Sequence, residues 1–162
     1  KEECGKKEWK KDSFTLLGIP LHWEYEYPVV RRLRNEIFNL GEEAVKGPLS
    51  KLRAYYAKSE EAQKQKREQE KQEGKKGVMP DYSWRWQLAY HIARAAERYK
   101  NRASLRKFLE EQQQKVFIGK EQFKEDKEWR SNYEYFKLLD LAIRWAELEG
   151  RTRQAKKVSG TQ

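Results

Sequence analysis

The sequence predicts an all-α protein, a single helical bundle of about five helices with flexible basic termini. Apolar residues recur at spacings of three and four, runs of β-branched residues are few, and the breaks between periodic segments are short and contain Gly or Pro. A chain of 162 residues suffices for one domain with one modest core. We therefore expect an N-terminal extension over residues 1–27, a helical bundle domain over 28–150 and a disordered basic tail over 151–162.

The N-terminal extension carries turn signals and aromatic residues but little helical periodicity. Residues 1–12 are rich in Lys and Glu, and Gly18 and Pro20 mark turns. The alternating aromatic residues that follow are Trp23, Tyr25 and Tyr27. This alternation predicts either a short extended stretch or an ordered coil against the bundle.

Two helices are predicted between residues 28 and 71. The first begins at Pro28, whose missing N–H costs nothing at a first helical position, and ends at Gly41. Its apolar face consists of Val30, Leu33, Ile37 and Leu40. The second opens at Gly47–Pro48, and its apolar face starts with Leu49, Leu52, Tyr55 and Tyr56. It extends to about Lys71 because Gln, Lys and Glu favour helix, although a disordered linker over 63–76 is the alternative.

Three further helices follow a break over 74–80. The third has Asp81 as its N-cap, and its apolar stripe is Trp84, Leu88, Ile92, Ala95, Ala96 and Tyr99. The fourth begins at Ser104, ends at Gly119, and has as its apolar side Leu105, Phe108, Leu109, Gln112 and Val116. The fifth runs from about Glu121 to Glu149 and stops at Gly150. Its buried face is Trp129, Tyr133, Phe136, Leu139, Ile143 and Leu148.

Charge is the main functional signal in the composition. Charged residues make up 38% of the chain and hydrophobic residues 37%, so we expect a small aromatic-rich core under a charged surface. Lys and Arg number 36 against 26 Asp and Glu, for a net charge of +10. Such an excess attracts polyanions through its summed potential and through counterion release. Nucleic acid is the expected partner, and no membrane is expected because the sequence has no spare apolar stripe.

The residues do not favour catalysis, so we expect no enzyme activity, no catalytic residue, no metal and no cofactor. No Cys or His pair has metal-ligand spacing, the glycines form no phosphate-binding loop, and the carboxylates alternate with Lys and Arg. Cys4 is the single cysteine, which rules out a disulfide within the chain. Apolar runs near 18 residues and signal-peptide patterns do not occur in the sequence. These features indicate a cytoplasmic location.

Seven basic residues are the candidate RNA contacts: Lys51, Arg53, Arg85, Arg94, Arg98, Lys100 and Arg102. Arg94 and Arg98 are four apart and share a helix face, whereas Lys51 and Arg53 point in different directions. No acid lies between Glu97 and Glu110, so the basic run over 98–107 is expected to contact phosphate. The alternative, solubilising charges with acidic partners, fits Arg94 with Glu97, and Lys107 with Glu110 or Glu111.

Aromatic rings lie beside these basic residues, and stacking on bases requires them to be exposed. We expect Trp84 and Tyr90 mainly in the core, while Trp86 and Tyr56 fit the core and the surface about equally well. The sequence contains no pattern that resembles a base-reading code. Contact with the nucleic-acid backbone, independent of sequence, is therefore expected.

Four segments follow one another in a familiar order and spacing: PLSKLRAYY, WRWQLAYHIAR, SLRKFLEE and EYFKLLDLAIRWAELEG. Over about residues 48–150 the chain resembles the small helical subunit of type III CRISPR RNA-guided effector complexes, as a divergent branch. The resemblance implies an all-α subunit for antiviral defence that contacts the backbone subunits and holds guide RNA and target RNA through basic residues. By position, Ser50, Lys51 and Arg53 match the first motif, and Tyr90 and Arg94 match the second. It implies that Lys51, Arg53 and Arg94 face RNA and that Tyr90 is structural.

We therefore expect a non-catalytic RNA-binding structural subunit of such a complex, which contacts the guide and target RNA backbone and neighbouring subunits. Two alternatives remain open. One is a helical protein–protein adaptor, in which the charge only maintains solubility. The other is a ribosome-type ribonucleoprotein subunit, which would share the RNA-binding chemistry and differ in its partner.

Overall fold

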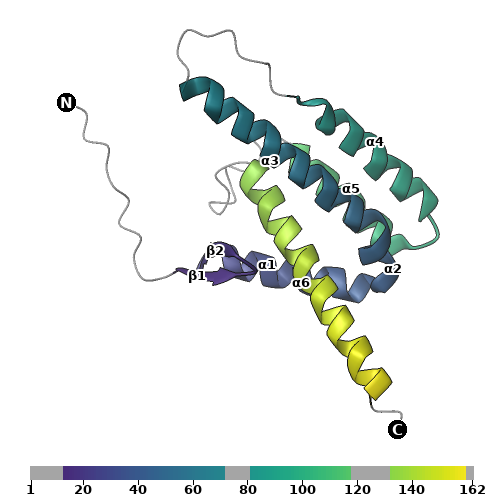
Figure 1. Ribbon diagram of the computed structural model, residues 1–162. Coiled ribbons are helices and arrows are strands. Elements are labelled where there is room, and N and C mark those ends of the chain that lie inside the picture. Colours follow the sequence, from purple (N-terminus) through teal and green to yellow (C-terminus); the bar gives the residue numbers. More distant parts are fainter. Residues whose placement is uncertain (1–12, 72–80, 118–131, 160–162) are drawn as a thin grey trace.

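The computed structural model describes residues 13–71, 81–117 and 132–159 (Figure 1). Over these ranges the protein is an all-α helical bundle, as predicted, to which one small hairpin is added. The elements are β1 (Ser13–Leu16), β2 (Ile19–His22), α1 (Glu26–Leu40), α2 (Glu42–Ala44), η1 (Val45–Leu49), α3 (Ser50–Lys71), α4 (Ser83–Arg98), α5 (Ala103–Phe117) and α6 (Asn132–Ser159). Figure 1 shows α3 beside α4 and α6 crossing α1, and α3, α5 and α1 all pack on α6.

The N-terminal hairpin replaces the expected plain extension. The two strands pair antiparallel, with Ser13 opposite His22 and Leu16 opposite Ile19. Leu17 and Gly18 both have positive φ, 50° and 81°, which matches the two-residue turns whose twist suits a hairpin. The extended strands thus lie within residues 13–22, before Trp23, Tyr25 and Tyr27, whose alternation had suggested an extended stretch. Helix α1 begins at Glu26, two residues before the predicted start at Pro28.

One helical segment runs without interruption from Glu42 to Lys71, so the predicted helix start at Gly47–Pro48 is wrong. The dipeptide lies inside η1, a turn of π-helix. Proline has no N–H, and its ring clashes with a preceding carbonyl in a regular α-helix, which the wider turn relieves. The single O–H of Ser50 is shared between the carbonyls of Lys46, at 3.0 Å, and Gly47, at 2.7 Å from Oγ. Residues 63–71 are helical, as predicted in preference to a linker, and residues 72–80 lie outside the described residues.

Helices α4 and α5 follow the predicted pattern closely. The N-cap position of α4 is Tyr82, one residue after the predicted Asp81, whose carboxylate accepts a hydrogen bond from the backbone N–H of Ser83 at 2.8 Å. In α4 the buried residues are Leu88, Ile92 and Ala96, and all five predicted apolar positions of α5 are buried. The predicted end at Gly119 lies outside the described residues.

Helix α6 continues through Gly150 to Ser159, so the predicted stop at Gly150 is wrong, and residues 151–159 are helical rather than disordered. An interior glycine costs only about 1 kcal/mol, and contacts on both sides of it hold the helix. Arg151 donates a hydrogen bond to Glu147 at 2.5 Å, and the Arg153 guanidinium lies 4.2 Å from the Phe38 ring centroid. The predicted segment 121–131 and residues 160–162 lie outside the described residues.

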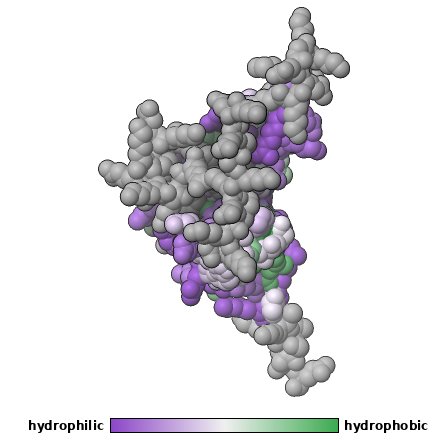
Figure 2. All heavy atoms as spheres, turned by 90° about the vertical axis from the view of Figure 1, so that its left-hand side faces the viewer, coloured by the Kyte–Doolittle hydropathy of each residue, from purple (hydrophilic) through white to green (hydrophobic). Residues whose placement is uncertain are grey.

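The core is mainly aliphatic rather than aromatic. Its largest fully buried side chains are Phe136 and eleven Leu or Ile residues. The first half of α6 is buried on most sides, with Leu138, Leu139 and Leu141 at most 1% exposed. Leu148, predicted to be buried, is 44% exposed. On the face in Figure 2 the described residues are mostly hydrophilic, with one small hydrophobic patch.

Candidate nucleic-acid interface

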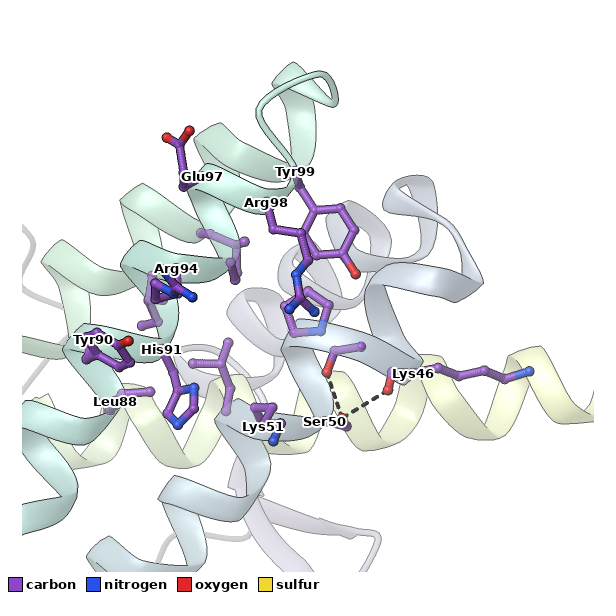
Figure 3. Close-up of a pocket in the computed structure, with 16 residues that line it drawn as sticks. Lys46, Ser50, Lys51, Leu88, Tyr90, His91, Arg94, Glu97, Arg98 and Tyr99 are labelled. Atoms are coloured by element: carbon purple, nitrogen blue, oxygen red, sulfur yellow. Dashed lines mark hydrogen bonds between the residues drawn. The ribbon is translucent and has the colours of Figure 1, made fainter.

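A groove of about 640 Å³ lies between the start of α3 and the outer side of α4 (Figure 3). Its floor is apolar and includes the buried side chains of Leu52, Leu88 and Ile92. Its charged and aromatic lining residues include Lys46, Lys51, Tyr90, Arg94, Arg98 and Tyr99. The groove thus combines a hydrophobic base with a basic rim.

The packing of α4 explains why its basic residues are exposed and lie at the rim of the groove, not on its floor. Leu88, Ile92 and Ala96 repeat every four residues and point into the core. Tyr90, Arg94 and Arg98 also repeat every four residues, two positions further along. At about 100° per residue, this second row lies on the opposite side from the buried row. Arg94 and Arg98 therefore share one side of α4, as predicted.

Positive charge in the groove is only partly compensated. Lys46 forms an ion pair with Glu42 one turn earlier. The single acid of the lining, Glu97, points away from the groove in Figure 3 and lies 3.6 Å from Lys100. Within residues 13–71, 81–117 and 132–159, no acidic partner is found for Lys51, Arg94 or Arg98. These three cations are the ones available to an anionic ligand.

Three of the seven predicted RNA contacts therefore come together, namely Lys51, Arg94 and Arg98. Arg85 lies apart from the groove at the start of α4, with its guanidinium 6.0 Å from the Trp84 ring centroid. Lys100 pairs with Glu97, and the predicted pair of Arg94 with Glu97 is not formed.

Arg53 faces α6 instead of the groove. Its Nη1 donates a hydrogen bond to Glu147 at 2.5 Å, and its Nε lies 3.4 Å from Asp140 Oδ1. Burial raises the pKa of the Asp140 carboxyl, an effect that the nearby charges of Arg53 and Arg144 oppose. A second hollow, of about 720 Å³, lies beside this cluster and the hairpin turn. Both of its arginines pair with Asp140, which leaves Lys137 as its one lining cation without an acidic partner among the described residues, against three in the first groove.

The basic run over 98–107 is largely neutralised, contrary to prediction. Arg102 donates hydrogen bonds to the Leu40 carbonyl at 2.5 Å and to Glu43 at 3.0 Å. Arg106 pairs with Glu110 at 2.8 Å, and Lys107 lies 3.9 Å from Glu111. Glu110 and Glu111 lie one turn further along α5 and Glu43 lies on α2, so all three acids are outside residues 98–107. A stretch of sequence without Asp or Glu can therefore still have acidic side chains close to it in the folded protein.

The aromatic residues divide differently from prediction. Tyr56 is buried, with its ring centroid 5.3 Å from that of Phe136, and Trp84 packs partly buried on the same ring. Trp86 is 66% exposed and Tyr90 is 57% exposed, so the expectation that Tyr90 lies in the core is wrong. The signal was present in the spacing, since Tyr90 lies two positions from both Leu88 and Ile92 and cannot share their face.

The described residues include no group of three or more His, Cys, Asp or Glu that could hold a metal ion. None of the helices in these ranges is both long enough and apolar enough to cross a membrane. Comparisons of the chain with protein-family models, with curated proteins and with solved structures found no match.

Proposed function

We propose that this protein is a non-catalytic RNA-binding subunit that holds RNA by its phosphate backbone in the groove between α3 and α4. The observation that carries the proposal is the convergence of Lys51, Arg94 and Arg98 on one groove without acidic partners among the described residues. Phosphates bound by such side chains release counterions, which supplies affinity without reading sequence. Arginine adds two parallel N–H donors that match a phosphate, and lysine adds a compact charge.

The motif resemblance gives the proposal a particular RNA partner. Lys51 belongs to the SKLR segment and Arg94 to the LAYHIAR segment, and both line the same groove. This supports a role as the small subunit of a type III CRISPR effector, with guide and target RNA as ligands and backbone subunits as neighbours. Arg53, the third residue that the resemblance implied, is not part of the proposed interface because it pairs with Glu147 and Asp140.

A protein–protein adaptor is the second candidate function. It is favoured by the acidic partners of Lys100, Arg102, Arg106 and Lys107, which are the contacts expected of charges that maintain solubility. The adaptor would bind no RNA on its own.

The test is the salt dependence of RNA binding by two variants that remove the same charge. One is Lys51→Ala/Arg94→Ala/Arg98→Ala, and the other, from the paired run, is Lys100→Ala/Arg106→Ala/Lys107→Ala. Both are first checked for helix content by circular dichroism. A short single-stranded RNA should bind the wild type with an affinity that falls as salt rises. The groove variant should reduce the slope of log K against log [salt] by roughly 2, at about 0.7 for each phosphate contact, and the control should change it little.

Two results would argue against the proposal. Equal losses in both variants would mean that net charge, and not the groove, attracts RNA. No binding by the wild type at low salt would favour the adaptor.

A further inference from the structure

Two large aromatic rings lie exposed on the outer face of α4. Trp86 and Tyr90 are 66% and 57% exposed and are four residues apart, so they lie on one side of the helix about 6 Å apart along its axis. Among the other exposed rings, Trp23 stacks on Phe14 at 4.0 Å, Tyr25 lies 4.7 Å from His22, and Tyr82 is less exposed, at 40%. Trp86 has no ring partner within the described part of the chain. Its indole is left open to a ligand.

The exposed rings continue directly into the basic groove. Tyr90 lines the groove, and the Arg94 guanidinium lies 5.9 Å from its ring centroid (Figure 3). Trp86, Tyr90 and Arg94 thus form one row, each a helical turn from the next. Phosphates held by Arg94 and Lys51 would bring the attached bases next to the rings. Because the adjoining groove is positively charged, we infer that the ligand bound along this row is a nucleic acid strand.

We propose that Trp86 and Tyr90 form a stacking platform for unpaired bases, so that the protein prefers single-stranded RNA to duplex RNA. The inference rests on the proposed RNA-binding function and specifies its ligand. Inside a duplex both faces of each base are covered by neighbouring bases, whereas an unpaired base can stack on an aromatic side chain. Every base has such a face, so stacking provides affinity without sequence preference.

The spacing of the rings favours a stretched strand. Neighbouring bases in a stacked strand are about 3.4 Å apart, roughly half the separation of the two rings along the helix axis. Each ring would therefore take its own base from a strand whose bases are not stacked on one another. Trp, Tyr and Arg also recur at protein–protein hot spots, so a protein partner is the competing occupant that an experiment must separate.

The experiment measures binding of an end-labelled single-stranded RNA of about a dozen nucleotides, within the range that single-strand sites span, and of the same strand in a duplex. The variant is Trp86→Ala/Tyr90→Ala. The matched control is Trp23→Ala/Tyr25→Ala, which removes the same two residue types at 49% and 57% exposure. The platform variant should bind single-stranded RNA roughly 5- to 150-fold more weakly and duplex RNA unchanged. The control should match the wild type, and Trp86→Phe/Tyr90→Phe should retain most of the affinity.

Tryptophan fluorescence gives an independent readout. Single-stranded RNA should quench the wild-type emission, and the part due to Trp86 should be missing in Trp86→Phe. If Trp86→Ala/Tyr90→Ala binds single strands as the wild type does, while Lys51→Ala/Arg94→Ala/Arg98→Ala has lost binding, the platform is disproved and the phosphate groove stands. If the wild type binds neither RNA form, both proposals fail, and the exposed rings are assigned to a protein partner.

Discussion

Arg53 on α3 and Asp140 on α6 face each other, with 3.4 Å between Nε of the guanidinium and Oδ1 of the carboxylate. Asp140 is buried, and a buried carboxylate is stable only when opposite charge lies near it. Arg53 supplies that charge and also bonds Glu147, two turns further along α6. A residue that the sequence motif places at an RNA interface therefore joins two helices of the bundle.

Replacing Arg53 by Ala should destabilise the fold rather than abolish RNA binding. The substitution leaves the Asp140 and Glu147 carboxylates without this partner, which should lower the free energy of unfolding by about 1–3 kcal/mol. Urea denaturation measures the loss. Lys51→Ala is the control, since Lys51 is exposed and lacks an acidic partner in the described ranges, and it should stay close to wild type. Equal stability of the two variants would contradict this role for Arg53.

The buried Asp140 should give stability a defined pH dependence. Burial raises its pKa in the folded protein, so the folded state holds the proton at a pH where the unfolded chain has released it. The free energy of unfolding should therefore fall as pH rises from the ordinary Asp value of about 3.9 through the raised pKa, and then level off. Asp140→Asn removes this titration.

The stability of Asp140→Asn relative to wild type should accordingly improve as pH rises through that window and stay constant above it. Urea denaturation of both proteins from acid to neutral pH measures the difference. A relative gain by the wild type with rising pH would show that its folded-state pKa is lowered instead.

The buried faces of the helices could be predicted because spacing encodes them directly. Val30, Leu33, Ile37 and Leu40 all lie in the core, since residues three and four apart share one side of a helix. Helix boundaries were less predictable. Gly150 is a weak local signal, because neighbouring contacts outweigh a cost of about 1 kcal/mol for an interior glycine. Pro48 is a stronger signal, but the π-helical turn relieves the clash that would break a regular α-helix.

The candidate site could be predicted only in part. Lys51, Arg94 and Arg98 were chosen because they are basic, but only the packing of α3 against α4 places them in one groove. Arg53 and Arg102 were chosen for the same reason, but their side chains form ion pairs and hydrogen bonds within the protein. Their acidic partners lie far away in the sequence, so no local rule could identify them.

The hydrogen bond between the buried side chains of Tyr135 on α6 and Gln112 on α5 should contribute to stability. The Tyr135 hydroxyl donates a hydrogen bond to the side-chain carbonyl of Gln112, which is fully buried. Tyr135→Phe removes the donor and leaves that carbonyl without it, at a cost of about 1–3 kcal/mol. Replacing both residues, as Gln112→Leu/Tyr135→Phe, should cost less than Tyr135→Phe alone because no unpaired polar group remains.

A double-mutant cycle in urea measures the coupling between these two residues. Tyr82→Phe, at a tyrosine that is 40% exposed, is the control and should be neutral. Additive losses in the double variant would mean that the two side chains act independently.

Arg102 should stabilise the end of α1 in a way that lysine cannot reproduce. Its Nη2 donates to the Leu40 carbonyl at 2.5 Å, and Leu40 is the last residue of α1, where carbonyls lack a partner within the helix. Its Nη1 donates to Glu43 at 3.0 Å. Arg102→Ala should therefore lower the free energy of unfolding by about 1–2 kcal/mol. Arg102→Lys should recover little of this, because a single ammonium lacks the planar fork that reaches both acceptors.

Glu43→Ala separates the two contacts of Arg102. The Glu43 side chain is 84% exposed, so its ion pair is screened by water and its removal should cost little. Urea denaturation of the three variants should rank Glu43→Ala near wild type, with Arg102→Lys and Arg102→Ala both well below it. Full rescue by lysine would mean that charge alone matters at this position. A loss in Glu43→Ala as large as that in Arg102→Ala would assign the stabilisation to the surface ion pair instead of the helix end.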